Sequence, residues 1–153
     1  MKLLLTALLF AGFAIPAGDP PGFKLWTSAE LKGFSKSLAP KVDAQKFAMQ
    51  SLGGHGNYTF AIAHREGSGQ AELHETQADV FFVQSGSATL VYGGTVVGGK
   101  TTQPHEIRGA SINGGQEKNL SAGDVVTIPA KTPHLLKIDP GKEFTYFFVK
   151  VTQ

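Results

Sequence analysis

The chain contains no cysteine among its 153 residues. This absence excludes disulfide bonds, thiolate catalysis and cysteine-ligated zinc. Charge is also scarce, because charged residues make up 17% of the sequence and the formal net charge is +2. Lysine and arginine form no cluster and no stripe, so the electrostatic footprint of a nucleic-acid-binding protein is missing. We therefore expect no nucleic-acid partner.

The sequence also lacks an apolar run long enough to cross a membrane, which takes about 20 residues. Its most apolar segment, residues 3–15, follows a short positive start and precedes a segment rich in proline and glycine. This order is typical of a secretory signal peptide; a buried or lipid-embedded N-terminal helix is the alternative. We predict a signal peptide over residues 1–18, cleavage near Ala17, and a periplasmic or secreted bacterial protein without membrane contact after cleavage. The missing cysteines suit an oxidising periplasm.

The length favours a single domain, and 19 glycines with 8 prolines suit an all-β protein rich in turns. One segment differs. The capping box Thr27-Ser-Ala-Glu30 precedes apolar residues at helical spacing, which predicts a short helix over about 28–38 that Pro40 ends. We assign residues 19–46 to an N-terminal arm with this helix and residues 47–153 to a β-barrel domain.

After the arm, apolar and polar residues alternate in short runs separated by Gly, Pro, Asn, Ser or Asp, which predicts strands joined by turns. Strands are expected near 47–51, 58–65, 71–75, 79–85, 88–92, 116–120, 124–128, 134–138 and 144–151. Many short strands with regular turns indicate a sandwich or a barrel. The glycine-rich segment 93–115 is expected to be an extension between two barrel strands, of the kind that forms lids or subunit contacts.

Ligand-type side chains gather in two stretches, residues 69–86 and 123–134, among alternating apolar residues. In the first stretch, Glu72 and His74 are two positions apart on a predicted strand. They should therefore share a face, with Cα atoms about 6.5–7 Å apart. A carboxylate and an imidazole at this spacing can converge on one metal ion.

Two further groups are predicted on inner faces. Asp79 follows a short connection, enough for a tight turn into the neighbouring strand, and shares a face with Phe81. His134 shares a face with Leu136. A carboxylate at the solvated rim and a hydrogen-bonded core histidine are the alternatives for single residues of this kind. Because a buried carboxylate needs a partner, four ligand-type groups together favour a metal site.

The other three histidines carry weaker signals. His55 lies in a glycine-rich turn and is expected to be solvated. His64 shares a strand face with Phe60 and Ile62, which favours a satisfied core or rim histidine over an extra ligand or a hydrogen-bond donor to the ligands. His105 lies in the glycine-rich extension and is expected to be exposed; the alternative is that a lid closing over the barrel mouth uses it.

The two stretches resemble the paired motifs of the cupin superfamily. The first motif of that family has a glycine, His-x-His, a glutamate three or four residues on, and a second glycine after six more. His74 matches the second histidine, Asp79 stands at the glutamate position and Gly86 is the closing glycine. The second motif is matched in register by Gly123, Pro129 and His134. The resemblance covers about residues 47–151 and implies a small jelly-roll barrel with a metal bound inside.

This chain departs from the family pattern at four positions. Glu72 stands where the first histidine belongs, Asp79 is one methylene shorter than glutamate, and Lys131 and Ile138 replace the glycine and asparagine of the second motif. The resemblance implies a divalent metal ion whose ligand set is close to the two-His-one-carboxylate arrangement. Oxygen donors favour Fe(II) or Mn(II), with zinc or nickel as alternatives. The expected metal ligands are Glu72, His74, Asp79 and His134.

We therefore expect an exported single-domain cupin that holds one divalent metal and acts on a small organic molecule at the open barrel end. Oxygenation, isomerisation and lyase chemistry all suit such a site. Glu72 is expected as the fourth ligand or as the general base toward a molecule held at the ion. The apolar wall is expected from Phe60, Phe81, Tyr146 and Phe148. The alternative is a non-catalytic module that captures a sugar or another small ligand, and the resemblance also implies a homodimer.

Overall fold

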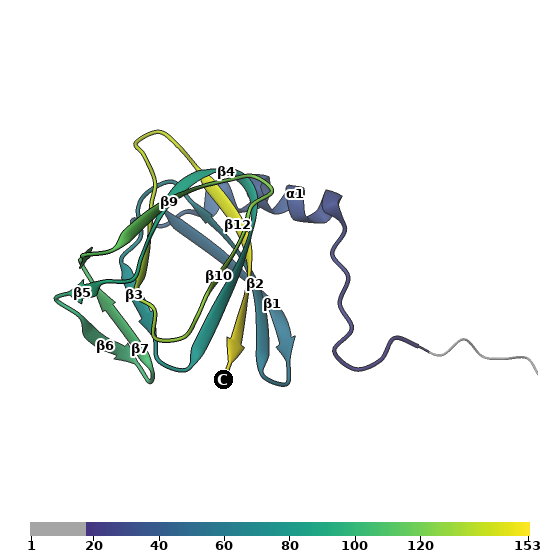
Figure 1. Ribbon diagram of the computed structural model, residues 1–153. Helices are drawn as coiled ribbons and strands as arrows, with labels where there is room; N and C mark the ends of the chain where they lie inside the picture. The colour runs from purple at the N-terminus through teal and green to yellow at the C-terminus, as the bar shows by residue number, and fades with distance from the viewer. Residues whose placement is uncertain (1–17) are drawn as a thin grey trace, which may run out of the picture.

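The computed structural model describes residues 18–153, so the predicted signal peptide and its cleavage near Ala17 lie outside the described residues, apart from Gly18. Within the described part, antiparallel strands curl around a central core, and one short helix lies against the outside of the sheet (Figure 1). No helix in this part of the chain is long and apolar enough to cross a membrane. The predicted all-β barrel with a short N-terminal helix is confirmed.

The elements of residues 18–153 follow the predicted order, with additional short strands in the glycine-rich segment. Their bounds are α1 Ser28–Leu38, η1 Ala39–Lys41, β1 Phe47–His55, β2 Tyr58–Arg65, β3 Ala71–His74, β4 Gln77–Tyr92, β5 Thr95–Val97, β6 Lys100–Gln103, β7 Glu106–Gly109, β8 Ser111–Asn113, β9 Gln116–Ser121, β10 Val125–Ile128, β11 His134–Lys137 and β12 Phe144–Thr152.

Helix α1 begins where the capping box predicts. Thr27 Oγ1 accepts a hydrogen bond from the Glu30 backbone N–H at 3.2 Å, and the Glu30 carboxylate accepts one from the Thr27 N–H at 2.7 Å. These reciprocal bonds satisfy two amide groups that have no partner within the helix. The helix covers the outer face of β1, β2 and β12, where Leu38 packs with Ile62 and Phe147.

The strands form one curled sheet in the order β1-β2-β12-β4-β11-β3-β7-β6, with β9 and β10 also paired to β4. The N-terminal half of β4 pairs with β10 and β12, and its C-terminal half pairs with β9 and β11. Strand β4 therefore belongs to both sides of the barrel. Strands β1, β6, β9 and β10 each have a single paired neighbour among the described residues, so the curled sheet is a half-barrel with free edges.

The predicted break between two strands near Gly86 is wrong. The sequence predicts separate strands over 79–85 and 88–92, but β4 runs through both. Gly86 adopts φ +76°, and a Cβ there would lie 1.9 Å from the Glu143 carbonyl oxygen. The register with β12 also shifts between Thr145 and Tyr146, as a bulge requires. Gly86 therefore bends the strand from one side of the barrel to the other and does not end it.

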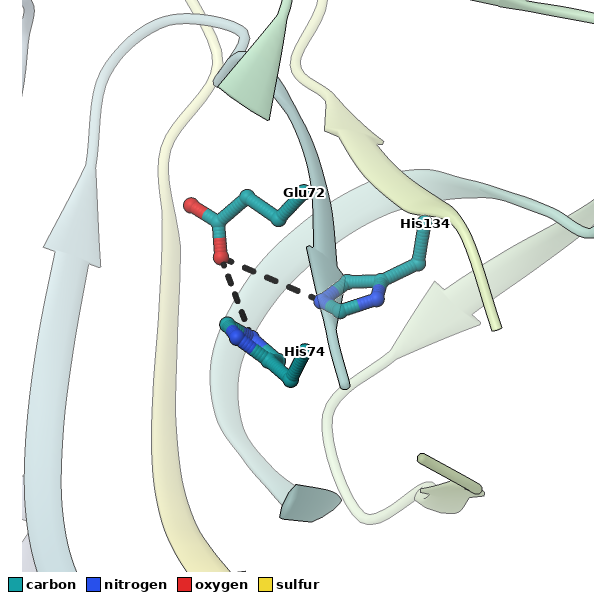
Figure 2. A group of neighbouring side chains, drawn as sticks. All are labelled: Glu72, His74 and His134. Atoms are coloured by element: carbon teal, nitrogen blue, oxygen red, sulfur yellow. Dashed lines mark ion pairs between the residues drawn. The ribbon is translucent and has the colours of Figure 1, made fainter. Parts of the chain in front are cut away.

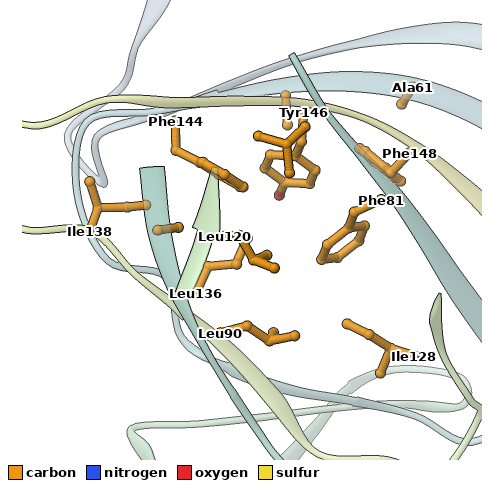
Figure 3. Close-up of a cluster of buried hydrophobic side chains, with 13 residues drawn as sticks. Ala61, Phe81, Leu90, Leu120, Ile128, Leu136, Ile138, Phe144, Tyr146 and Phe148 are labelled. Carbon is orange, nitrogen blue, oxygen red and sulfur yellow. The ribbon is translucent and has the colours of Figure 1, made fainter. Parts of the chain in front are cut away.

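Inward-facing side chains fill the closed part of the barrel (Figure 3). Rings dominate one side, where Phe81 lies 4.8 Å from Tyr146 between ring centroids. Full burial of a side chain of this size stabilises the fold by about 1.5–3 kcal/mol. The buried members of the cluster are Ala61, Ala63, Phe81, Val83, Ala88, Leu90, Leu120, Ile128, Leu136, Ile138, Phe144, Tyr146 and Phe148.

The glycine-rich segment 93–115 has more regular structure than its sequence suggests. It forms the short strands β5 to β8, in which β5 pairs with β8 and β6 pairs with β7. Strand β7 pairs with β3 and so extends the barrel sheet at that side. The segment is therefore an extension between barrel strands, as predicted, and it also contributes a strand next to Glu72 and His74.

Candidate metal centre

The four predicted ligands converge from two sides of the barrel. Glu72 and His74 lie on β3, and His134 begins β11, where it pairs directly with Glu72. Asp79 lies on the part of β4 that belongs to the opposite side. The expected tight turn into a neighbouring strand is wrong, because β3 and β4 do not pair with each other. The chain crosses the barrel instead, and Asp79 faces the histidines across it.

The ligand-type atoms meet at short distances. Glu72 Oε2 lies 3.6 Å from His74 Nε2 and 3.9 Å from His134 Nε2 (Figure 2). Asp79 Oδ2 lies 3.2 Å and 3.4 Å from the same two nitrogens. Glu72, His74 and His134 each offer an atom within 4.8 Å of the others. Donors bound about 2.0–2.2 Å from one ion in a tetrahedral site lie about 3.3–3.6 Å apart, so these separations fit a single metal.

The orientation of both rings suits coordination through Nε2. His134 Nδ1 lies 3.1 Å from the Thr132 carbonyl oxygen, and His74 Nδ1 lies 2.8 Å from Glu106 Oε2. Each Nδ1 thus lies close to an oxygen atom outside the centre, and each Nε2 faces the centre. His134 is 4% exposed, and its Nε2 has no hydrogen-bond partner among the described residues. A buried nitrogen without a partner is costly, and a cation would satisfy it.

Lys150 is a member of the site that the sequence analysis missed. Its Nζ lies 2.8 Å from His74 Nε2 and 2.9 Å from Asp79 Oδ1. Lys150 is the cross-strand partner of Asp79, which explains the contact. The side chain of Lys150 therefore lies between His74 and Asp79, at the point where the ligand-type atoms converge.

The extension supplies two more charged groups through its register with β3. Glu106 pairs with His74 and Arg108 pairs with Glu72 across β7 and β3. Arg108 Nη1 lies 2.9 Å from Glu72 Oε1, and its Nε donates to Glu106 Oε1 at 2.7 Å. The guanidinium therefore fixes the outer oxygen of Glu72 and leaves Oε2 toward the histidines.

Neighbouring groups hold the two buried carboxyl groups of the centre in their ionised form. Burial opposes ionisation of Glu72, but hydrogen bonding to His74 and the charge of Arg108 outweigh it and lower the pKa of Glu72 to about 2. Burial also opposes ionisation of Asp79, yet the adjacent His134 and His74 imidazoles and the charge of Lys150 hold its pKa far below the usual range. Both carboxylates are therefore ionised at neutral pH.

His74 responds to the same charges. Burial lowers the pKa of an imidazole, but hydrogen bonds to Asp79, Glu106 and Glu72 outweigh burial and raise the pKa of His74 to about 10. The metal-free centre thus retains a proton at neutral pH, in a position where a divalent ion would replace it. The donor set of two imidazoles and carboxylates fits a divalent metal.

A cavity of about 680 Å³ opens beside this centre. Glu72, Asp79 and Lys150 line it together with Phe81, Tyr146 and Phe148. A volume of this order accommodates a small organic molecule. The expected wall is thus confirmed for three of its four aromatic residues.

Phe60, the fourth expected wall residue, is a wrong prediction. It lies on the outer face of β2 and packs against Trp26 beneath the N-terminal arm, with ring centroids 5.0 Å apart. His64 shares that outer face and is fully buried, and its Nδ1 lies 2.8 Å from Thr145 Oγ1. This contact confirms a core histidine and places His64 away from the metal centre.

The remaining histidines lie at the surface. His55 is the last residue of β1 and is exposed, as predicted. His105 is 62% exposed, and its Nδ1 lies 3.1 Å from Glu75 Oε2. This surface ion pair is outside the cavity that contains Glu72, so His105 does not join the ligand set in this structure.

Alternation contained signals for the missed residues. Along β12, Tyr146 and Phe148 face inward, and period two places Lys150 on the same face. Along β7, Glu106 and Arg108 are also two positions apart. In the first pattern a lysine follows two apolar wall residues, and the second pattern lies in a glycine-rich segment, so neither pattern by itself identifies a site residue.

Comparisons with known proteins identify the fold. No family model matches the sequence, and no curated protein matches it. A Thermus thermophilus protein has a TM-score of 0.55 and 16% identity, over 76% of this chain and 92% of its own. A cupin 2 conserved barrel domain protein from Salinispora arenicola has a TM-score of 0.50 and 16% identity, over 72% and 78%. A predicted oxalate decarboxylase from Thermotoga maritima has a TM-score of 0.52 and 15% identity, over 70% and 81%. The chain thus has the cupin fold.

Proposed function

We propose that this cupin-fold protein binds one divalent metal ion inside its barrel and acts there on a small organic molecule. The observation that carries the proposal is the arrangement of the two imidazoles. His74 and His134 direct Nε2 toward the same carboxylate oxygens, while their Nδ1 atoms face fixed oxygen atoms elsewhere. A cation bound between the rings would also satisfy His134 Nε2, which has no hydrogen-bond partner among the described residues.

The proposed ligands are His74, His134 and Glu72, with Asp79 as the fourth. Oxygen donors favour Fe(II) or Mn(II), and zinc or nickel are the alternatives. When bound, the ion would supply Lewis-acid or redox chemistry to a molecule in the cavity. For His74 to serve as a ligand, Lys150 must give up its contact with Nε2, while its contact with Asp79 can persist.

Residues around the cavity would accept a proton, orient Glu72 and exclude water. Glu72 lines the cavity, where its side chain is 17% exposed, so its carboxylate is placed to accept a proton from a bound molecule. Arg108 holds one oxygen of that carboxylate and keeps it oriented. Phe81, Tyr146 and Phe148 form an apolar wall that excludes water from the bound molecule.

Calorimetric titration of the chelator-treated protein with Mn(II) tests the proposal. We expect one ion per chain and a loss of affinity of at least 100-fold in His134→Gln, because the substitution removes one ligand. His105→Gln is the matched control, since His105 lies at the surface, and its affinity should change less than twofold. Equal binding by the wild type and His134→Gln would refute this centre.

The second candidate is a non-catalytic module that captures a sugar or another small ligand. The observation in its favour is Lys150, whose ammonium group already neutralises the centre without a metal. Elemental analysis of protein from its native compartment separates the two candidates. Bound metal whose removal abolishes turnover supports the enzyme, whereas metal-free protein with unchanged stability in Asp79→Ala supports the binding module.

We also propose export and self-association. The apolar segment 3–15 supports a signal peptide and a periplasmic or secreted location. The free edge of β1 offers a strand for pairing with a second copy, which supports a homodimer. Cell fractionation with N-terminal sequencing tests the first proposal, and sedimentation of the mature protein tests the second.

A further inference from the structure

Arg65 is a buried cation that the proposed metal centre does not use. It ends β2, and the residue is only 8% exposed. Its guanidinium carbon lies 4.3 Å from the centre of the Phe47 ring, and its Nε donates to the Tyr146 hydroxyl at 3.4 Å. Within residues 18–153, the guanidinium makes no ion pair with any carboxylate within 4 Å.

The other two cations of the cavity differ from Arg65 in this respect. Arg108 pairs with Glu72 and Glu106, and Lys150 pairs with Asp79. Burying an arginine without a counter-ion is unfavourable, and buried charges are normally paired. Arg65 therefore has unused capacity to bind a negative group.

The position of Arg65 makes that capacity available to a ligand. It lines the same cavity as Glu72 and Asp79. Gly69 lies against the guanidinium, and a Cβ there would be 3.0 Å from Arg65 Nη1. Because glycine has no Cβ, the loop before β3 approaches the guanidinium without covering it with a side chain.

We propose that Arg65 binds the carboxylate of a small organic ligand in this cavity. A guanidinium is planar and offers parallel N–H donors that match the two oxygens of a carboxylate. The inference rests on the proposed function only in placing the ligand beside the metal centre. The binding of the carboxylate by Arg65 does not itself require the metal.

The charge balance of the cavity favours a carboxylate over a phosphate. Arg65 is the cation without an ion-pair partner among the described cavity residues, so one negative charge completes its pairing. A phosphate dianion would add a second charge in the cavity that the carboxyl groups of Glu72 and Asp79 also line. The aromatic wall of Phe81 and Phe148 suits the apolar body of an organic acid.

Nuclear magnetic resonance of the wild-type mature protein tests the proposal directly. The chain has two arginines, so the side-chain Nε–Hε region contains two signals, which Arg65→Lys assigns. With chelator present and chloride held constant, we titrate benzoate, acetate and succinate, with benzamide as the neutral control. We expect at least one carboxylate to shift the Arg65 signal saturably and benzamide to leave it unchanged.

Two variants measure the contribution of Arg65 to affinity. Arg65→Gln should weaken carboxylate binding at least tenfold, because it removes the charge and the paired donors. Lys118→Gln causes the same change in net charge at an exposed position of β9 and should change affinity less than twofold. Equal losses in the two variants would reduce the effect to general electrostatics and overturn the proposal.

Other outcomes also overturn it. An Arg65 signal unmoved by all three carboxylates, or moved equally by benzamide, excludes a carboxylate site. Tighter binding of phenylphosphonate than of benzoate would reassign the site to phosphate. Because the wild-type titration contains no metal, its failure with intact Mn(II) binding counts against Arg65 alone. Carboxylate binding without Mn(II) binding counts against the metal centre alone.

Discussion

Lys150 Nζ lies 2.8 Å from His74 Nε2, at the nitrogen that metal coordination would require. Lys150 Nζ also lies 2.9 Å from Asp79 Oδ1, so it lies close to the position that a bound cation would take. A divalent ion and this ammonium would repel each other at such a distance. Lys150 thus competes with a metal ion for the same ligand residues, His74 and Asp79.

Replacement of Lys150 should therefore strengthen metal binding. In Lys150→Met, Asp79 loses its ammonium partner and His74 Nε2 becomes free, so Mn(II) affinity should rise about tenfold, or about 1.4 kcal/mol. Calorimetric titration at pH 7 measures the change. Lys137→Met, which removes an exposed lysine on β11, is the control and should leave affinity unchanged. Weaker binding in Lys150→Met would show that the lysine supports the site.

Glu106→Gln should weaken metal binding by about tenfold, because Glu106 lies 2.8 Å from His74 Nδ1 and orients the ring. Mn(II) titration and melting temperature are measured together, so that a folding defect is recognised. Glu75→Gln alters a comparable contact to the exposed His105 and should have no effect on Mn(II). Similar affinities for the two variants would argue against a positioning role for Glu106.

The stability of the metal-free protein should fall both at acid pH and at alkaline pH. His74 has its pKa raised from 6.5 to about 10, so its stabilising contribution is complete below pH 6.5 and is lost as pH rises toward 10. Glu72 has its pKa lowered from 4.5 to about 2, so its contribution is complete above pH 4.5 and is lost as pH falls toward 2. The melting temperature in chelator should therefore peak between about pH 5 and 6.5.

His74→Gln should remove the alkaline part of that profile, because it removes the group whose pKa is raised. His105→Gln should preserve the wild-type shape. A wild-type melting temperature that stays level from pH 6.5 to 10 would contradict the proton on His74. Mn(II) affinity should rise with pH over the same range, since the ion must displace this proton.

Gly86→Ala should destabilise the fold by about 3 kcal/mol or more. The position has φ +76°, and the added methyl would overlap the Glu143 carbonyl oxygen at 1.9 Å. Gly93→Ala is a matched control, because Gly93 has the same φ of +76° with no atom within 4 Å of the added Cβ. Its cost should be about 1–2 kcal/mol, from the backbone alone. Urea unfolding of both variants measures the difference, and equal costs would contradict the proposed close contact.

Local patterns in the sequence predict much of this fold. The capping box gives the start of α1, and period-two alternation gives most strands to within one or two residues. Gly86 shows where such reasoning fails. A glycine between two apolar runs usually marks a turn, and only contact with the distant Glu143 backbone makes it a bend inside β4.

The site was predictable to the extent that its residues lie in motif-like stretches. Glu72, His74, Asp79 and His134 come together as expected, although Asp79 arrives from the opposite side of the barrel. Arg65 could not be recognised as part of the cavity, because its pairing with Phe47 and its missing counter-ion are tertiary properties. The same holds for the Lys150 contact, which depends on the register of β12 against β4.

The sharing of β4 between the two sides of the barrel has a consequence for motions. Its backbone is bonded to β10 and β12 along one half and to β9 and β11 along the other, so neither side can detach while β4 stays intact. Amide hydrogens of β4 should exchange with solvent only when the whole domain opens, whereas those of the edge strand β6 should exchange through local fraying. Asp79 and His134 are thus held at a fixed separation for as long as the domain remains folded.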